Sequence, residues 1–407
     1  MTTSNALSET KTIAVFTSTR ADFGLLQPLI QKLQHIKNLK TVLFVTGTHL
    51  DTAFGSTVTE IEKAFPDLER IEVAWSADAG IQHHQLSLMA SSFTQFSKAI
   101  ETKTIHLAVV LGDRFETFCF ASVCATLKIP LAHIHGGELT FGALDDKYRH
   151  CITKLSELHF VSTKKYQDRV IQLGESPNAV FDVGAMGVEN ALNLKLKSVE
   201  ELIVGTGLKL NKNIFMMTFH PETNTQGHGT ELFKLFLNKF SMWLKTQPDC
   251  CVVVSGSNID QGGQQVRKLI ENFGAAVPGQ FSFIESLGMI NYLSLVKHAV
   301  AVLGNSSSGV IEANSLGTPA VNIGFRQDGR EVDPTVIQIS TEVDLNRFHF
   351  SDLIEFKKQN QTWKKSIYHK PDSARKIADH IFDYLNKTTS QSASKHFHDI
   401  KAVGGKL

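Results

Sequence analysis

The sequence contains no apolar run that approaches the roughly 20 residues of a membrane-spanning helix, and no basic run long enough to favour a nucleic acid or an anionic membrane surface. Its formal net charge is +1. The N-terminal stretch MTTSNALSETK lacks the basic and apolar regions of a signal peptide, so we expect the protein to be cytoplasmic. Neither a membrane nor a nucleic acid is therefore expected as a partner.

Several functional motifs are also missing. There is no GxxxxGKS or GxxxxGKT motif, which argues against a triphosphate P-loop. There is no HExxH or comparable ligand spacing, and the five cysteines are odd in number and lack zinc-type spacing. We therefore expect reduced thiols, no metal and no other cofactor. The cysteines are Cys119, Cys124, Cys151, Cys250 and Cys251.

What the sequence does contain is an alternation of apolar runs with longer amphipathic segments. Its 407 residues, 42% of them hydrophobic and 20% charged, are typical of a globular protein with two ordinary domains or one large domain. Apolar runs separated by helical patterns predict parallel sheets covered by helices on both faces. The expected strands are 12–18, 41–47, 106–112, 130–136, 158–163, 214–220, 250–256, 281–286, 299–304 and 319–324.

These strands form two series, separated near residues 187–210, where the apolar rhythm is lost. We therefore predict an α/β fold of two Rossmann-like, doubly wound domains that face each other across a cleft. The predicted boundaries are 1–188 and 189–370, with residues 371–407 forming a helix that packs back on the first domain and then a polar tail. Ligands of such sheets bind at the carboxyl ends of the strands. The polar residues expected there are Arg20, His49, Asp113, His135, His220, Ser255 and Asn305.

Residues 304–324, GNSSSGVIEANSLGTPAVNIG, are typical of a strand end, a turn of small residues and a helix that stops at Gly317. Free N–H groups at such a helix start form an anion site, to which the hydroxyls of Ser306 and Ser307 add donors. Glu312, about one turn into the helix, is placed to accept hydrogen bonds from a ribose diol. This pattern indicates a nucleotide-sugar, and the alternative is an ordinary serine cap with a surface glutamate.

Other charged residues follow or precede predicted strands and helices. Arg20 in TSTRADFG precedes a helix, where a guanidinium suits a phosphate oxygen, unless it is a surface residue. Asp113 and Arg114 in VLGDRFE follow a buried strand, where an unpaired charge is costly, so they form either a site or a mutual ion pair. His220 in FHPET ends a strand, where it has either a phosphate or proton role or a structural one.

The segment HIHGGELTFGALDDKYRH (133–150) concentrates acid–base groups around a glycine-rich loop. Neighbouring carboxylates raise each other's pKa, so one of Glu138, Asp145 and Asp146 can hold a proton while another accepts one. That pattern suits proton removal at one carbon and proton return elsewhere. A metal site and a helix start capped by Asp145 or Asp146 are the alternatives, and we expect one of these two aspartates to serve partly as a cap.

Together these segments resemble the hydrolysing UDP-N-acetylglucosamine 2-epimerases of bacterial sialic-acid and capsule biosynthesis, and the epimerase half of the animal bifunctional epimerase/kinase. The matching segments keep the family's order across about residues 12–331: TSTRADFG, VTGTHLDTAFG, VLGDRFE, HIHGGE, ITKLSELHFVSTKKYQDRVIQLGE, FHPET, GNSSSG and NIGFRQDGRE. The resemblance implies a GT-B-like fold in which the first domain carries the catalytic carboxylates and the second binds UDP. It also implies a homodimer or homotetramer.

The resemblance assigns roles to individual residues. Those implied at UDP are Arg20, His220, Ser306, Ser307, Glu312 and Arg326, and Arg114 and Asn258 are assigned to the substrate as well. The implied catalytic residues are Asp113, Glu138, Asp145, Asp146 and His220, with His49 in the loop that lines the sugar pocket. Non-hydrolysing relatives carry a glutamate at the position of His135, which points to the hydrolysing branch. Phe325 departs from the small or polar residue that is usual in the family.

The expected reaction converts UDP-N-acetylglucosamine and water into N-acetylmannosamine and UDP. A carboxylate removes the C2 proton as UDP leaves C1, and water then adds to the resulting 2-acetamidoglycal. We assign proton transfer to Asp113 and to Asp145 or Asp146, and support or water handling to Glu138. The alternative substrate is UDP-2,4-diacetamido-2,4,6-trideoxyglucose, on the way to legionaminic-type acids. A GT-B glycosyltransferase and a non-catalytic nucleotide-sugar sensor are the alternative functions, and the carboxylate-rich loop at 138–146 argues against both.

Overall fold

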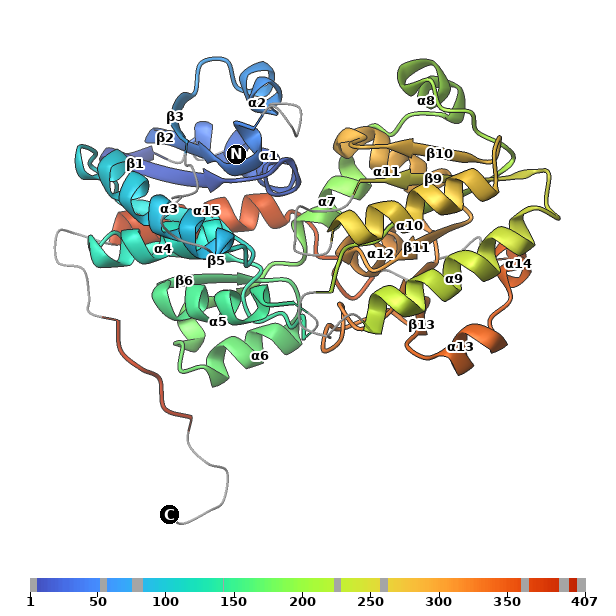
Figure 1. Cartoon of the computed structure of the whole chain (residues 1–407). Coiled ribbons are helices and arrows are strands. Elements are labelled where there is room, and N and C mark those ends of the chain that lie inside the picture. Colours follow the sequence, from blue (N-terminus) through green and yellow to red (C-terminus); the bar gives the residue numbers. More distant parts are fainter. Residues whose placement is uncertain are drawn as a thin grey trace, which may run out of the picture. The chain divides into compact units, whose positions relative to one another are not determined.

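The computed structural model describes residues 6–51, 57–74, 83–141, 143–222, 228–256, 263–359, 366–387 and 395–400. The chain divides into two compact units, each built on one parallel sheet (Figure 1). Unit 1 comprises Met1–Glu138, Asp145–Met186 and Lys370–Leu407, and unit 2 comprises Leu139–Leu144 and Gly187–His369. The predicted fold class, two doubly wound parallel α/β sheets, is confirmed.

Unit 1 contains a seven-stranded sheet in the order β3-β2-β1-β4-β5-β6-β7. Its strands are β1 (Ala6–Thr17), β2 (Lys37–Thr46), β3 (Glu69–Val73), β4 (Leu107–Leu111), β5 (Leu131–Ile134), β6 (Leu158–Val161) and β7 (Val180–Asp182). Its α-helices are α1 (Arg20–Gln34), α2 (Val58–Ala64), α3 (His84–Glu101), α4 (Phe115–Thr126), α5 (Asp145–Leu155), α6 (Lys164–Gln172) and α15 (Ser373–Lys387), and its 3-10 helices are η1 (Gly47–His49) and η3 (Pro177–Ala179).

The central strands of this sheet are apolar on both faces because helices cover both faces (Figure 1). Successive side chains of a strand point to opposite faces. Ile13 and Val15 of β1 therefore pack in a cluster with α1 and α15, whereas Ala14 and Phe16 pack in a second cluster with α3 and α4. Helix α15, which contacts α1 and β1, thus brings the C-terminal part of the chain into the core of unit 1.

Unit 2 contains a six-stranded sheet in the order β10-β9-β8-β11-β12-β13. Its strands are β8 (Asn213–Thr218), β9 (Cys250–Ser255), β10 (Phe281–Ile284), β11 (Ala301–Gly304), β12 (Ala320–Ile323) and β13 (Val336–Ile339). Its helices are α7 (Met186–Asn193), α8 (Val199–Thr206), α9 (His228–Leu244), α10 (Gly263–Ala276), α11 (Gly288–His298), α12 (Ser307–Ile311), η4 (Asn314–Leu316), α13 (Glu342–Arg347) and α14 (Phe350–Gln359).

The core of unit 2 is rich in aromatic rings on the face covered by α9, α10 and α14. Phe240 of α9 stacks on Phe273 of α10, with ring centroids 5.7 Å apart, and lies 4.8 Å from the ring of Phe350 in α14. Leu202 of α8 and Leu295 of α11 fill the opposite face. No helix in the described part of the chain is long and apolar enough to cross a membrane.

Both sheets reverse their strand order next to the first strand, between β1 and β4 in unit 1 and between β8 and β11 in unit 2. Connections leave such a pair of strands in opposite directions, which opens a crevice at their carboxyl ends. In unit 1 these ends carry Arg20 and Asp113, and in unit 2 they carry His220 and Ser306. These four predicted site residues therefore lie at the end of each sheet where ligands of doubly wound folds bind.

Gly304 lies at the end of β11 with φ +122, and a Cβ there would collide with the carbonyl oxygen of Thr218 in β8. We expect Gly304→Ala to lose about 1–3 kcal/mol from backbone strain alone, and more from the collision. Gly309→Ala is the matched control, because a Cβ at Gly309 meets Val302 at an ordinary 3.4 Å. Thermal unfolding should separate the two variants; equal melting temperatures would contradict the close approach of β8 and β11.

Candidate active site

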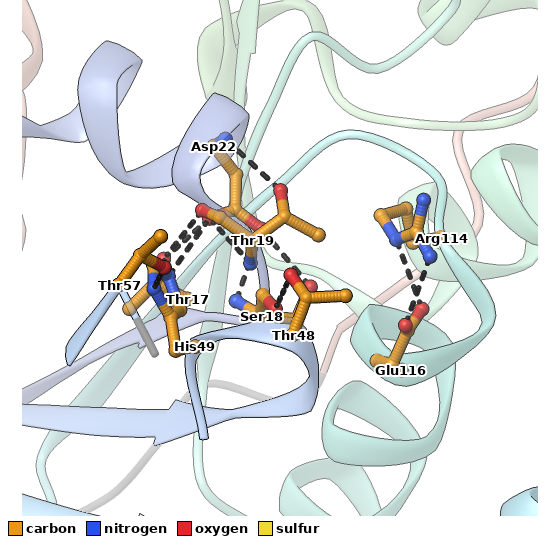
Figure 2. Close-up of polar contacts among 9 residues, drawn as sticks. All are labelled: Thr17, Ser18, Thr19, Asp22, Thr48, His49, Thr57, Arg114 and Glu116. Carbon is orange, nitrogen blue, oxygen red and sulfur yellow. Dashed lines mark hydrogen bonds and ion pairs between the residues drawn. The ribbon is translucent and has the colours of Figure 1, made fainter. Parts of the chain in front are cut away.

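The turn after β1 is organised by the buried carboxylate of Asp22 (Figure 2). Thr19 caps α1 and forms a capping box with Asp22. The carboxylate accepts hydrogen bonds from the backbone N–H groups of Ser18 at 3.0 Å and Thr19 at 3.1 Å, and from the hydroxyls of Ser18 and Thr17. These bonds fix the turn that places Arg20 at the first position of the helix.

His49, in the loop after β2, contacts the same turn through the hydroxyl of Thr17. Its ring is fully buried, with Nε2 2.9 Å from the hydroxyl of Thr17 and Nδ1 2.7 Å from that of Thr57 (Figure 2). Both ring nitrogens are thus engaged by threonines, so any influence of His49 on a bound sugar acts through the loop. Gly47 (φ +61) lets this loop approach, because a Cβ there would lie 2.6 Å from the carbonyl oxygen of Ser18.

Two predicted substrate-binding arginines of unit 1 have carboxylate partners. Arg20 pairs with Glu60 at 2.8 Å, and its side chain is 25% exposed. Arg114 donates from Nε and Nη2 to the two oxygens of the buried Glu116, at 3.1 and 3.0 Å (Figure 2). The predicted alternative of a mutual pair between Asp113 and Arg114 is not what the structure has, because Asp113 pairs with a different arginine.

That arginine is Arg149 of α5, which is 3% exposed and joins the ends of β4 and β5. Its Nη2 donates to Asp113 after β4, and its Nη1 donates to the carbonyl oxygen of His135 after β5 at 2.8 Å. The same Nη1 lies 3.8 Å from Glu138. Glu138 also accepts from the hydroxyl of Ser162 at 2.7 Å. The structure thus brings two of the predicted carboxylates together around one buried cation.

His135 completes this cluster. Its Nδ1 lies 2.7 Å from Oε1 of Glu138, and the residue is 7% exposed. Its Nε2 is buried and has no hydrogen-bond partner among the described residues. By contrast, both nitrogens of the neighbouring His133 are bonded, to Thr153 and to the carbonyl oxygen of Gly112, and burial lowers the pKa of His133 to about 3. His133 is therefore a neutral residue whose two ring nitrogens are both used within the fold, whereas only Nδ1 of His135 is bonded among the described residues.

Asp145 and Asp146 form the first turn of α5, so the predicted helix start at this position is confirmed. Negative charge in the first turn stabilises a helix. Oδ2 of Asp146 lies 3.7 Å from Nε2 of His150, one turn further along the same helix. In the described residues, no group of three or more histidine, cysteine, aspartate or glutamate side chains is arranged to hold a metal ion.

In unit 2, the fully buried Asn305 joins the loops after β8 and β11. Its side-chain oxygen accepts from the backbone N–H of His220 at 2.7 Å, and its Nδ2 donates to the His220 carbonyl oxygen at 2.8 Å. The carbonyl oxygen of Asn305 in turn accepts from Arg326 at 3.2 Å and Gln327 at 2.7 Å. Asn305 thus ties His220, the serine turn and Arg326 together at the end of the sheet.

The serine turn differs in one respect from the prediction. Ser306 caps α12, and its hydroxyl accepts from the N–H of Ser308 at 3.4 Å, but α12 has only five residues, and η4 follows it. The chain leaves helical conformation at Gly317 (φ +73), as predicted. Glu312 ends α12 and lies against Gly187, where a Cβ would collide with its carboxylate. A helix of five residues has only a weak dipole. The groups that could bind an anion at this turn are therefore its serine hydroxyls and backbone N–H groups.

Two residues without a predicted role shape the surroundings of this turn. Burial raises the pKa of Tyr292 to about 12, and its hydroxyl faces Ser306, Ser308 and the charge of Glu312. Glu222 is buried and accepts from the backbone N–H groups of Phe325 at 2.7 Å and of Arg326 at 3.2 Å. Glu222 could have been found from its place in FHPET, whereas Tyr292 lies outside every matching segment. Asn258, predicted at the substrate, lies outside the described residues.

Asp22 provides a test of the turn after β1. Burial by itself would raise the pKa of Asp22, but the nearby His49 and the hydrogen bonds from Thr17 and Ser18 outweigh it, so the pKa lies below its usual value. Ionised Asp22 therefore stabilises the fold above about pH 4, and this contribution is lost as the pH falls through the folded-state pKa.

We expect Asp22→Asn to cost about 2 kcal/mol at pH 7, because charged hydrogen bonds are lost, and to cost less at pH 3, which lies below the usual pKa of an unfolded-state aspartate, so that part of the contribution of its charge is already lost. Denaturant unfolding at the two pH values measures the difference. The exposed Asp168→Asn, which loses a surface pair with Lys164, is the control. A cost for Asp22→Asn that is independent of pH would contradict the role of its charge.

Comparisons with known proteins agree on one family. The family model for UDP-N-acetylglucosamine 2-epimerase matches residues 31–382. The GDP/UDP-N,N'-diacetylbacillosamine 2-epimerase (hydrolyzing) of Campylobacter jejuni is 36% identical over 318 residues, which cover 78% of this chain and 81% of that protein. The polysialic acid biosynthesis protein P7 of Escherichia coli is also 36% identical, over 333 residues that cover 82% of this chain and 83% of that protein.

The fold is shared more widely than the sequence. The crystal structure of the UDP-GlcNAc 2-epimerase of Neisseria meningitidis bound to UDP-GlcNAc superimposes with a TM-score of 0.73 at 18% identity, covering 92% of this chain and 100% of that one. Such neighbours share the two-sheet, GT-B-like fold class expected from the sequence. With a family model that spans most of the chain and relatives at 36% identity, the chain belongs to the UDP-N-acetylglucosamine 2-epimerase family.

Proposed function

We propose that this chain is a hydrolysing 2-epimerase that converts UDP-N-acetylglucosamine and water into N-acetylmannosamine and UDP. The observation that carries the proposal is the cluster that the half-buried Asp113 forms with the buried Arg149, Glu138 and His135 at the ends of β4 and β5. Epimerisation needs one group to remove a proton and another to return one, and this cluster holds several acid–base groups in a preorganised position. The relative from Campylobacter jejuni is named as hydrolyzing, which supports the same type of reaction.

The residues of unit 2 suit the nucleotide. The proposed diphosphate contacts are the donors of Ser306 and Ser307, the guanidinium of Arg326 and the imidazole of His220, which Asn305 ties into one loop system. Donors that are held in place stabilise a diphosphate as it leaves, because they need not reorganise when its charge develops. Glu312 is the proposed acceptor for the ribose diol.

The chemistry follows from the weak acidity of the C2 hydrogen. Departure of UDP from C1 builds positive charge beside C2, which allows a carboxylate to take the C2 proton and leaves a 2-acetamidoglycal. Water then adds at C1 while a proton returns to the opposite face of C2. We assign the C2 proton transfers to Asp113 and to Asp145 or Asp146, and support or water handling to Glu138; each group that transfers a proton contributes roughly 10²–10⁴ in rate.

A second substrate has specific support. The Campylobacter jejuni relative is named for a diacetylbacillosamine nucleotide and the Escherichia coli relative for polysialic acid biosynthesis, and both are 36% identical to this chain. The equal sequence identities therefore support UDP-2,4-diacetamido-2,4,6-trideoxyglucose and UDP-N-acetylglucosamine to the same extent as substrates. The experiment below offers both nucleotides to the same enzyme preparation, so that the ratio of their kcat/KM values decides.

Incubation with each UDP-sugar in D₂O, followed by NMR, tests the proposed function. We expect free UDP and a free 2-epimerised N-acetyl sugar that carries deuterium at C2, because the C2 proton is exchanged with solvent during elimination and addition. Reaction in ¹⁸O-water should place the label at C1 of the sugar. A free sugar that keeps its original C2 hydrogen would instead indicate direct hydrolysis, and product formed only with an added acceptor would indicate a transferase.

Asp113→Asn tests the carboxylate. The amide keeps the shape of the side chain but cannot accept a proton, so turnover should fall at least about 100-fold. UDP affinity in calorimetry should remain within about threefold, because the proposed UDP contacts lie elsewhere in the chain. The variant also weakens the pairing of the buried Arg149, so its folding must be checked by circular dichroism. Asp168→Asn, at an exposed pair, should keep full activity. A folded Asp113→Asn enzyme with near wild-type kcat would remove Asp113 from the mechanism.

A further inference from the structure

His135 is the residue of this cluster whose acid–base group is left open to a ligand in the described part of the chain. Its Nε2 is buried without a hydrogen-bond partner among the described residues, although most buried polar atoms of proteins are paired. We propose that His135 is a catalytic base whose Nε2 takes the proton from the water that adds to C1 of the 2-acetamidoglycal. This proposal rests on the proposed function, because it names the residue that carries out the hydrolytic half of that reaction.

The ring of His135 is oriented by Glu138. Nδ1 lies 2.7 Å from Oε1 of Glu138, which also accepts from Ser162 at 2.7 Å and has the guanidinium of Arg149 3.8 Å from its other oxygen. The guanidinium and the hydroxyl beside it favour Glu138 as a hydrogen-bond acceptor, so in the neutral form of His135 the proton lies on Nδ1. The lone pair of Nε2 is then the free one. A carboxylate that holds the tautomer of an imidazole also stabilises the cation formed when the imidazole takes a proton.

The backbone of His135 has an energetically unfavourable conformation, which surrounding contacts hold in place. His135 has φ +66, a conformation that is uncommon for residues other than glycine and is found where surrounding structure enforces it. The enforcing contacts are visible on both sides of the residue: its N–H donates to the carbonyl oxygen of Phe160 at 2.8 Å, and its carbonyl oxygen accepts from Arg149 at 2.8 Å. A strained residue pinned at both backbone groups, with its side chain bonded at one nitrogen only, is what a preorganised base requires.

The chemical step balances without a further reactant. The water oxygen forms a bond to C1 of the glycal, and the proton of that water passes to Nε2 of His135. The electron pair of the C1–C2 double bond takes a proton at C2 from a protonated carboxyl group, Asp113 or one of Asp145 and Asp146, which becomes a carboxylate. The imidazolium of His135, paired with Glu138, then returns its proton to solvent or to that carboxylate.

His135→Asn removes Nε2 with little other change. Asparagine tolerates positive φ better than most residues, and its amide can still donate to Glu138. His135→Gly relieves the strain altogether and serves as the second variant. In both we expect UDP release to remain within about threefold of wild type, and hydration of the 2-acetamidoglycal to fall at least about 100-fold, so that the glycal accumulates in the NMR spectrum. Added imidazole should restore hydration in the glycine variant.

The control is His35→Asn, at an exposed histidine at the end of α1, which should behave as wild type with and without imidazole. Loss of UDP release together with hydration in a folded variant, or hydration that is unaffected, would overturn the assignment of His135. Supplying authentic 2-acetamidoglycal together with UDP measures the hydration step separately from the release of UDP, and so tests the role of His135 apart from the proposed function. A wild-type enzyme that releases no UDP from either UDP-sugar, or that fails to hydrate the supplied glycal, refutes the function, whereas a folded His135→Asn variant that hydrates the supplied glycal at the wild-type rate refutes the role of His135.

Discussion

The arrangement of unit 1 depends on how one buried cation is neutralised. Arg149 is 3% exposed, and an ion removed from water costs several kcal/mol unless it is paired. Its partners come from two strand ends: Asp113 follows β4, and the carbonyl oxygen of His135 follows β5. One side chain from α5 therefore sets the positions of two loops. With Glu138 close by, two carboxylates surround one guanidinium, and the excess negative charge is what a transferred proton would balance.

In unit 2, too, one buried side chain connects the loops after two neighbouring strands, but this side chain is uncharged. Asn305 joins the ends of β8 and β11 through both atoms of its amide, and its carbonyl oxygen orients Arg326. The buried carboxylate of Glu222 accepts from the backbone N–H groups of Phe325 and Arg326 on the same loop. An amide and a carboxylate therefore hold the loop of Arg326, where a diphosphate is proposed to bind.

The strands show what the sequence can and cannot predict about this fold. The ten predicted strands are present, because central strands of a parallel sheet are buried on both faces and so read as unbroken apolar runs. The three strands that the apolar pattern does not reveal are β3, β7 and β13, and each lies at an edge of its sheet. Edge strands have one neighbour and are partly exposed, as in β13, where two of four residues face solvent. The charged residues of β3 and the three-residue length of β7 make these two strands look like loops in the sequence.

The candidate site shows a different limit. Asp113, Glu138 and His220 could be placed at strand ends, because the position of a residue after an apolar run is a property of the local sequence. Which side chains contact one another at those strand ends depends instead on residues that are far apart in the sequence. Arg149 lies 36 residues from Asp113, and its sequence context is that of an ordinary helix, so only the fold reveals that it is the cation of the site. The unpaired Nε2 of His135 and its positive φ are likewise consequences of tertiary contacts. The sequence therefore places His135 at a strand end, whereas only the fold shows that its Nε2 has no hydrogen-bond partner among the described residues.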